Sequence, residues 1–189
     1  MEYVSSTVFS SPLGWNAVSL RESRVARLSF GHSSEVDAEY AAAAWRDSLG
    51  LLAADDRGHP QPADGTIKQI LMQIVRRLRA FMAGEADDFL DVAIDDRGMT
   101  EYHCRVIDEL RRVPIGRTIS YGELAARAGS PGAARAAGNF MAGNQVPLVI
   151  PCHRVIRSDG GLGGFSAPSG IAMKKRLLNM EARMAGQML

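Results

Sequence analysis

The segment VPLVIPCHRVI, residues 146–156, ends a short apolar run on Pro-Cys and places His and Arg directly after the cysteine. A strand that only packs into a core has no need of such side chains at its tip. Cys152 is a candidate nucleophile, because the thiolate is the reactive form of cysteine and a neighbouring base or cation favours it. The segment therefore predicts a reactive site at Cys152.

His153 is the natural candidate for the base. Sequence neighbours point in different directions in strands and helices, so a direct hydrogen bond to Cys152 and a link through a bridging water are both open. Glu181 follows Leu178 and Leu177 by three and four residues, so in the expected last helix it shares their apolar face, where a carboxylate needs a partner. A carboxylate paired with His153 would fix its tautomer and strengthen it as a base. The other interpretations are a histidine satisfied within the core and a surface acid near the terminus.

The amino-terminal half is expected to begin with an antiparallel meander. Three short extended segments separated by turn-forming residues carry this prediction; their sequences are STVFSS, WNAVSL and RVARLSF. Residues 35–52 are Ala-rich and favour a helix, and apolar side chains recur at helical spacing over residues 67–82. Residues 55–65 are expected as a loop, residues 88–94 as a further strand, and residues 95–100 as the boundary between two domains.

The carboxy-terminal half is expected to be helical. Thr100 can cap a helix that runs to about Arg112, and Ser120 with Glu123 three residues later is the sequence signature of a capping box. The helix that follows this box is short and ends near residues 128–129. A second short helix after a turn that contains glycine would complete a helix-turn-helix.

The second helix of that pair is expected to open at Ser130 and Pro131, as N-cap and first-position proline, and to stop in a left-handed conformation at Gly143. Its sequence, PGAARAAGNFMAGN, is mostly Ala and Gly with one long cation, Arg135. Such a helix cannot read much base sequence, but it can approach a backbone or a narrow groove closely. Arg135 is therefore either a probe or wedge, or a solvated charge on a tightly packed helix.

The composition narrows the class of protein. The chain has 189 residues, 46% hydrophobic and 23% charged, as in soluble globular proteins. No apolar run reaches the roughly 20 residues of a membrane span, and the amino terminus lacks a signal-peptide pattern, so a cytoplasmic protein is expected. The two cysteines, Cys104 and Cys152, are too few for a disulfide framework and have no CxxC partner for zinc. The glycine-rich segment 158–170 matches no nucleotide-binding motif and is expected to form a wall or lid.

Charge is divided unevenly along the chain. Residues 1–98 hold 10 Lys or Arg and 15 Asp or Glu, a net charge of −5, whereas residues 99–189 hold 12 and 6, a net charge of +6. A basic half predicts an anionic partner, and nucleic acid is the first candidate.

A family resemblance connects these features. The run GRTISYGELAARAGSPGAARAAGNFMAGNQVPLVIPCHRVIRSDGGLGGF, with SGIAMKKRLLNME near the end of the chain, resembles the O6-alkylguanine-DNA alkyltransferases, also called methylated-DNA–protein-cysteine methyltransferases. The resemblance is strongest over residues 98–182, and SPLGWNAVSLRESRVARLSFG is similar to the family's amino-terminal sheet. It implies an α/β (α+β), ribonuclease H-like domain with a small antiparallel sheet over residues 1–97. A mainly helical DNA-binding and alkyl-acceptor domain with a winged helix-turn-helix is implied over residues 98–189.

The activity that the resemblance implies is single-turnover DNA repair by a methylated-DNA–protein-cysteine S-methyltransferase. Such a protein rotates O6-methylguanine, and O4-methylthymine as a further substrate, out of duplex DNA. It then transfers the alkyl group irreversibly to Cys152. No cofactor and no metal are expected, since the cysteines that bind zinc in some animal members are absent. The expected partner is double-stranded DNA containing O6-alkylguanine, bound by a protein that is a monomer in solution; cooperative assembly on DNA is left open.

The resemblance also implies catalytic roles for matching positions. His153 and Glu181 match the water-linked relay that forms the thiolate of Cys152. Asn144 matches the hinge asparagine that ties the recognition helix to the cysteine segment. Gln145 follows it where the family commonly has Pro, so this turn is expected to be less rigid.

Contacts with DNA are implied in the same way. Arg135 matches the finger inserted into the base stack, and Tyr121 the tyrosine that crowds the 3′ phosphate and donates a hydrogen bond to the flipped base. Backbone groups of the reactive cysteine and Val155, with Ser166, match those that read the base edge. Phe165 stands where some members have Tyr, which removes one hydroxyl. The expected DNA- and substrate-binding set is Tyr121, Arg135, Ala136, Met141, Val155 and Ser166.

Two other functions compete with this one. A protein that recognises alkylated DNA without reacting would recruit other repair factors, but relatives of that kind carry Trp in place of Cys152. A Cys-His hydrolase or acyl transferase would need an oxyanion hole and true turnover, and it would leave Arg135, Tyr121 and the basic half unexplained. Without a cysteine-rich region before the amino-terminal sheet, the transcription-regulating type is not expected.

Overall fold

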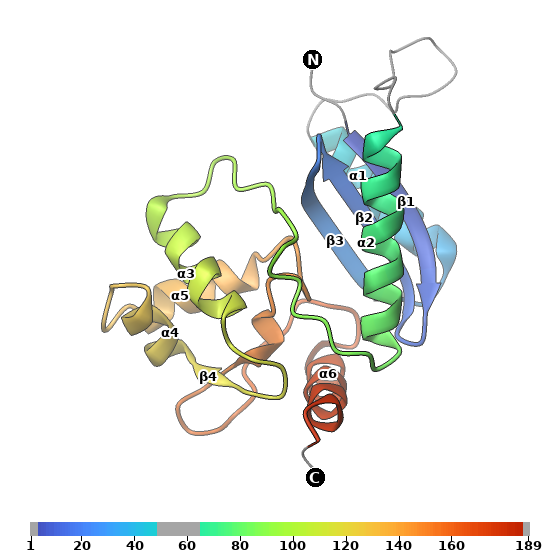
Figure 1. Cartoon of the computed structure of the whole chain (residues 1–189). Coiled ribbons are helices and arrows are strands. Elements are labelled where there is room, and N and C mark those ends of the chain that lie inside the picture. Colours follow the sequence, from blue (N-terminus) through green and yellow to red (C-terminus); the bar gives the residue numbers. More distant parts are fainter. Residues whose placement is uncertain (1–3, 49–64, 187–189) are drawn as a thin grey trace. The chain divides into compact units, whose positions relative to one another are not determined.

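The computed structural model describes residues 4–48 and 65–186, which form two compact units (Figure 1). The amino-terminal unit comprises the described residues up to 83 together with 92–95, and the carboxy-terminal unit comprises residues 84–91 and 96–186. The expected domains, residues 1–97 and 98–189, stay a prediction. No helix in the described part of the chain is long and apolar enough to cross a membrane.

Three antiparallel strands form the sheet of the amino-terminal unit, which confirms the predicted meander. In sheet order they are β1 (Val4–Ser11), β2 (Gly14–Arg21) and β3 (Arg24–His32). Asn16 fixes the turn between β1 and β2, because its buried Nδ2 donates to the carbonyl oxygens of Phe9 and Gly14 at 3.0 and 2.9 Å. Gly14 has φ 117°, and a Cβ there would lie 2.7 Å from the carbonyl oxygen of His32, so the turn requires glycine.

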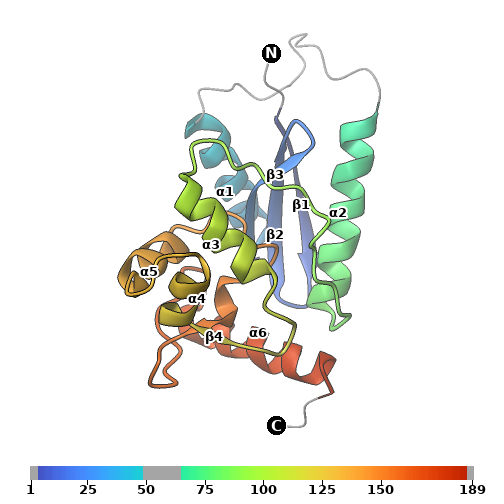
Figure 2. The same cartoon turned by 60° about the vertical axis from the view of Figure 1, so that its left-hand side comes forward.

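Two helices pack against this sheet. Helix α1 (Glu35–Ser48) contacts all three strands, and α2 (Thr66–Met82) contacts β1 and β2; Figure 1 and Figure 2 show both helices beside the strands of their unit. The predicted apolar stripe is the buried side of α2, formed by Leu71, Ile74, Val75, Leu78, Phe81 and Met82. The expected helix over residues 35–52 is confirmed up to Ser48. Residues 49–52 and all but the last residue of the expected loop 55–65 lie outside the described residues.

The expected strand over residues 88–94 does not form. The carboxylates of Asp87 and Asp88 accept hydrogen bonds from the backbone N–H groups two residues further on, at 2.9 and 3.0 Å. Such local pairing competes with a sheet ladder. Near the end of the segment, Ile94 forms an isolated parallel bridge with Val25. The prediction was wrong because it used the apolar pattern alone, which gives no sign of these hydrogen bonds from backbone N–H groups to aspartate side chains.

The carboxy-terminal unit is mainly helical (Figure 2). Its elements are α3 (Glu101–Arg111), β4 (Ile119–Ser120), α4 (Tyr121–Arg127), α5 (Ala134–Ala142), the 3-10 helix η1 (Cys152–Arg154), β5 (Val155–Ile156) and α6 (Gly170–Met184). Thr100 caps α3 as expected, accepting from the N–H of His103 at 3.2 Å. Helices α4 and α5 pack on each other as a helix-turn-helix, and β4 pairs with β5 in parallel. The predicted fold class is confirmed.

Helix α5 begins later than expected. Residues 130–133 form a turn, closed by a hydrogen bond of 3.1 Å from the N–H of its last residue to the carbonyl oxygen of its first. Within it, Gly132 has φ 88°, outside the helical region. The first helical residue is Ala134 rather than Pro131, because Ser-Pro is as favourable in a turn as at a helix start. The helix does end before Gly143, but Gly143 has φ −93° and is not left-handed.

Ser120 caps α4 and fixes where the helix-turn-helix begins. Its hydroxyl accepts from the N–H of Glu123 at 3.1 Å and the Glu123 carboxylate accepts from the N–H of Ser120 at 3.1 Å, which confirms the predicted capping box. The Ser120→Ala variant is expected to lower the free energy of unfolding by about 1 kcal/mol, because one N–H loses its acceptor. Chemical denaturation measures this loss.

Ser169→Ala is the matched control. Ser169 occupies the N-cap position of α6 without a side-chain cap hydrogen bond, so its loss should change the stability by less than about 0.5 kcal/mol. Equal losses in the two variants would contradict the contribution assigned to the capping box.

Candidate active site

Cys152 lies at the end of a tightly buried segment. Val146, Leu148, Val149 and Ile150 are each at most 2% exposed, and Cys152 itself is 9% exposed. Leu148 has φ 72°, a conformation that costs a non-glycine residue about 1–3 kcal/mol and that the surrounding packing must impose. The N–H of Cys152 donates to the carbonyl oxygen of Ile150 at 2.8 Å. The thiol is therefore presented at a fixed place.

Asn144 connects the end of α5 to this segment. Its Nδ2 donates to the carbonyl oxygen of Ile150 at 2.8 Å, and its Oδ1 accepts from the N–H of Val146 at 3.0 Å. One side chain thus ties two backbone positions before the cysteine to the end of α5. Gln145, the departure from the family pattern, leaves both bonds in place.

His153 and Glu181 form a pair without exposed surface, with His153 Nε2 2.7 Å from Glu181 Oε1. Burial raises the pKa of Glu181, but the hydrogen bonds and charges of His153 and Arg154 outweigh burial and hold this pKa at about 2. Burial lowers the pKa of His153 and disfavours its charged form. The ring N–H of His153 and the guanidinium of Arg154 together keep Glu181 ionised.

The protonation of His153 follows from this pairing. An ionised carboxylate only accepts hydrogen bonds, so Nε2 of the neutral ring carries the proton and Nδ1 keeps a lone pair. Within the described residues, Nδ1 is buried and has no hydrogen-bond partner. The direct hydrogen bond from Cys152 to His153 that the sequence left open therefore does not form. Nδ1 is the atom that can accept a proton.

Arg154 is a site residue that the sequence did not identify. Its Nε and Nη2 donate to the two oxygens of Glu181, each at 2.9 Å, and its Nη1 donates to the carbonyl oxygen of Val113 at 2.6 Å. The N–H of Gly116 adds a bond of 3.2 Å to Glu181 Oε2. The arginine is 2% exposed. Its position directly after His153, together with the need of a buried carboxylate for partners, was the available signal.

Lys174 is the second missed residue. It has no exposed surface, and its Nζ donates to the carbonyl oxygens of Val155 and Leu162 at 2.6 and 2.5 Å. Burial raises the pKa of Cys152, while hydrogen bonds from Asn144 and from backbone groups and the charge of Lys174 act in the opposite direction. The signal in the sequence is the spacing 174, 177, 181, which places the lysine on the buried face of α6 with Glu181.

The pKa of Tyr121 depends on the charge of the Cys152 sulfur. Tyr121 is the first residue of α4 and is partly buried; burial raises its pKa, and the negative charge of the Cys152 thiolate raises it further. A Cβ at Gly163 would lie 3.3 Å from the Tyr121 hydroxyl, and one at Gly138 would lie 3.7 Å from its ring. Glycines on α5 and on the glycine-rich segment therefore make room for the tyrosine.

The remaining expected residues lie in different surroundings. Arg135 and Ala136 are exposed on α5, whereas Met141 is 6% exposed and belongs to the core. Val155 is fully buried. The exposed Ser166 donates from Oγ to the carbonyl oxygen of Ala142 at 2.9 Å. The structure thus brings the expected catalytic residues together and places two of the expected DNA-contacting side chains on the surface of α5.

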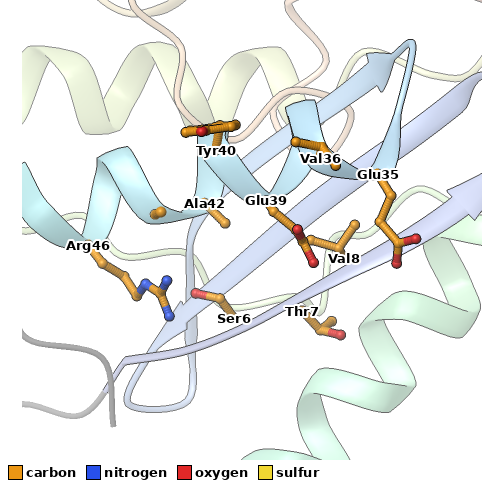
Figure 3. Close-up of a pocket in the computed structure, with 10 residues that line it drawn as sticks. Ser6, Thr7, Val8, Glu35, Val36, Glu39, Tyr40, Ala42 and Arg46 are labelled. Carbon is orange, nitrogen blue, oxygen red and sulfur yellow. The ribbon is translucent and has the colours of Figure 1, made fainter. Parts of the chain in front are cut away.

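Two further features lie outside this cluster. In residues 4–48 and 65–186, no group of three or more His, Cys, Asp and Glu side chains could hold a metal ion. The amino-terminal unit has a pocket of about 750 Å³ between β1 and α1, and Figure 3 shows Glu39 and Arg46 reaching from α1 toward the strand. Its lining contains none of the expected site residues; it consists of Ser6, Thr7, Val8, Glu35, Val36, Glu39, Tyr40, Ala42, Ala43 and Arg46.

The carboxy-terminal unit matches a known family model. Residues 101–183 match the description "6-O-methylguanine DNA methyltransferase, DNA binding domain". The methylated-DNA–protein-cysteine methyltransferase of Methanothermobacter thermautotrophicus is 44% identical over 118 residues, 62% of this chain. The match spans 65% of that relative, less than two thirds of its length. The DNA base-flipping protein of Thermus thermophilus is 38% identical over 128 residues, which are 66% of this chain and 83% of that protein.

A solved structure extends the likeness to nearly the whole chain. Mycobacterium tuberculosis OGT in complex with DNA has a TM-score of 0.65 and 31% identity, over 95% of this chain and 93% of that one. The fold, the buried thiol site and these matches define one class of protein. The chain belongs to the 6-O-methylguanine DNA methyltransferase family.

Proposed function

We propose that the protein repairs DNA by flipping O6-methylguanine out of the duplex and transferring its methyl group irreversibly to Cys152. The observation that carries the proposal is the buried arrangement of Cys152, His153 and Glu181, in which a thiol adjoins a histidine fixed by an ionised carboxylate. The methyltransferase named among the relatives supports the same reaction. We propose O4-methylthymine as a second substrate of this thiol.

The first chemical step is loss of the thiol proton. Since burial raises the pKa of Cys152, the resting thiol is protonated at neutral pH and needs a base. Nδ1 of His153 takes this proton through a water molecule, and Glu181 stabilises the imidazolium that forms. Asn144 assists by holding the cysteine segment and by hydrogen bonding that lowers the pKa of Cys152.

Methyl transfer is then a displacement at carbon. The thiolate sulfur forms a bond to the methyl carbon as the bond from that carbon to O6 of guanine breaks. The electron pair of the broken bond stays with the base. The Tyr121 hydroxyl stabilises the base by a hydrogen bond, and the base takes up one proton from the site. Thiol and methylated base become thioether and guanine. Nothing in this chemistry regenerates the thiol, so each molecule acts once.

DNA is bound through the helix-turn-helix. The exposed side of α5 carries Arg135 and Ala136, and its small residues allow close approach to a groove. Residues 99–189 carry a net charge of +6, which favours contact with phosphates and makes binding sensitive to salt. The structure of the related OGT with DNA supports this partner.

Arg135 is proposed to fill the space that the flipped base leaves. The Arg135→Ala variant is expected to slow methyl transfer from duplex DNA by about 10-fold or more, because extruding a base costs a few kcal/mol that the arginine offsets. Its stability should change by less than about 0.5 kcal/mol, since the residue is exposed. Single-turnover kinetics with a methylated duplex measures the rate.

Two comparisons make this test specific. Arg183→Ala removes an exposed arginine from α6 and should leave the rate unchanged. The defect of Arg135→Ala should shrink when the methylated guanine stands in a mismatch or a single strand, where flipping costs less. A defect of the same size on all of these DNAs would contradict the proposed role in base flipping.

Stoichiometry tests the proposed function. The protein is mixed with increasing amounts of duplex containing one O6-methylguanine, and its intact mass is measured. One added methyl group per protein, with no further repair at excess DNA, is the expected result. The same titration with O4-methylthymine tests the second substrate.

A damage-recognition protein is the second candidate, because one relative is named a DNA base-flipping protein. If this chain were a damage-recognition protein, it would bind methylated DNA tightly and gain no mass. The free, buried Cys152 beside His153 favours transfer over recognition alone, and the titration separates the two.

A further inference from the structure

Lys174 is a buried charge to which the proposed mechanism gives no part. Removing an ammonium from water costs several kcal/mol unless charge or hydrogen bonds compensate it. Lys174 has no exposed surface, and its Nζ donates to two backbone carbonyl oxygens. Among the described residues no carboxylate forms a salt bridge with it. Carbonyl oxygens solvate an ammonium but do not neutralise it.

The two carbonyl oxygens belong to two different segments that follow Cys152 in the chain. Val155 follows η1, which contains Cys152, and Leu162 lies in the glycine-rich segment. A Cβ at Gly163, the next residue in that segment, would lie 3.3 Å from the hydroxyl of Tyr121. The ammonium therefore fastens the glycine-rich segment to the strand after the cysteine, next to the tyrosine proposed to contact the base.

Lys174 and the Cys152 thiol also interact electrostatically. Burial lowers the pKa of Lys174, and the negative charge of the Cys152 thiolate raises it; the charge of Lys174 in turn lowers the pKa of Cys152. Arg154 is balanced by Glu181, so Lys174 is the positive charge left over in this buried group. Formation of the thiolate balances it.

We propose that Lys174 is a positioning residue of the alkyl-transfer site, holding the glycine-rich segment against the strand after Cys152 and supplying the positive charge that favours the thiolate. The identity of the substrate in this proposal rests on the proposed function. The effect of Lys174 on the Cys152 thiol does not require DNA. Methylation turns the thiolate into a neutral thioether. Lys174 can then no longer gain a balancing negative charge through ionisation of the sulfur.

The test measures the reactivity of the Cys152 thiol as a function of pH with iodoacetamide as the probe. All proteins carry Cys104→Ser, so that Cys152 is the single thiol. Lys174→Met keeps the apolar stem and removes the charge, and Lys175→Met, an exposed neighbour on α6, is the matched control. Lys174→Met is expected to move the midpoint of the profile upward by about one pH unit or more and to slow alkylation at pH 7 about 10-fold, with the rates converging at high pH. Equal midpoints in the two variants would overturn the proposal.

A second measurement needs no substitution at Lys174, in case the methionine variant does not fold. The side chain of Lys174 is titrated by NMR in the unreacted protein and after methylation of Cys152. Because the interaction of two titrating groups is reciprocal, Lys174 is expected to lose its proton at a lower pH once the cysteine is methylated. An unchanged titration would show that the lysine is only a structural anchor.

Methyl transfer from DNA separates this inference from the proposed function. A wild-type protein that takes no methyl group from DNA, but whose thiol profile depends on Lys174, would refute the function and support the role of the lysine. Transfer at the normal rate together with a thiol profile independent of Lys174 would refute the inference alone.

Discussion

The Cys152→Ser variant is expected to lose methyl transfer by about four orders of magnitude or more, the scale on which loss of a nucleophile acts in enzymes. A serine hydroxyl in the same place is a far weaker nucleophile than a thiolate, and His153 cannot ionise it to a comparable extent. Serine is close to cysteine in size, so the buried segment should keep its packing. The rate at which methylated duplex loses its methyl group, followed by chromatography of the digested DNA, measures this effect.

Binding provides the control for this variant. Cys152→Ser keeps Arg135 and the rest of α5, so its affinity for methylated duplex should stay within about twofold of the wild-type value. Cys104→Ser, which changes the other free cysteine, should leave transfer intact. A Cys152→Ser protein that still transfers methyl groups, or a Cys104→Ser protein that does not, would place the acceptor elsewhere.

The Glu181→Gln variant is expected to lose both stability and activity. It leaves the guanidinium of Arg154 buried without its counter-charge, and breaking a buried pair from one side costs about 3–5 kcal/mol. It also removes the ionised acceptor that fixes the ring of His153, so transfer should slow by about 100-fold or more, within the range of general-base contributions. Denaturation and single-turnover kinetics measure the two losses. Glu101→Gln, which breaks an exposed pair with Arg105, should change neither by a measurable amount.

The stability lost in Glu181→Gln should depend on pH. The pKa of Glu181 is held at about 2 in the folded protein and is about 4.3 in an unfolded chain. Between these values the unfolded state binds more protons than the native state, so stability rises with pH. The contribution, about 3 kcal/mol, is fully present above pH 4.3 and disappears as the pH falls to about 2. The difference between wild type and variant should therefore shrink over this range; a constant difference would contradict the ionised state assigned to Glu181.

Local sequence signals predicted local structure well. The capping box of Ser120 and Glu123 could be read directly, because both partners lie within one turn of a helix. The pairing of His153 with Glu181, 28 residues apart, was predicted because a buried carboxylate restricts the choice of partners. The start of α5 was missed because Ser and Pro favour turns and helix starts alike.

The missed site residues depend on contacts across the fold. Arg154 donates to the carbonyl oxygen of Val113, 41 residues away, and Lys174 donates to carbonyl oxygens 19 and 12 residues away. Every residue has a main-chain carbonyl group, so no sequence motif identifies the ones that will accept these hydrogen bonds. A long cation on a predicted apolar face, as Lys174 is, was the one available indication.

Peptide mapping of the protein after reaction with O6-methylguanine duplex tests the central claim most directly. The account predicts one methyl group on the peptide that carries Cys152 and none on the peptide that carries Cys104. Tandem mass spectrometry of the modified peptide locates the group on the sulfur. A methyl group on any other residue, or tight binding of the methylated duplex with every peptide unmodified, would contradict the claim that Cys152 is the alkyl acceptor.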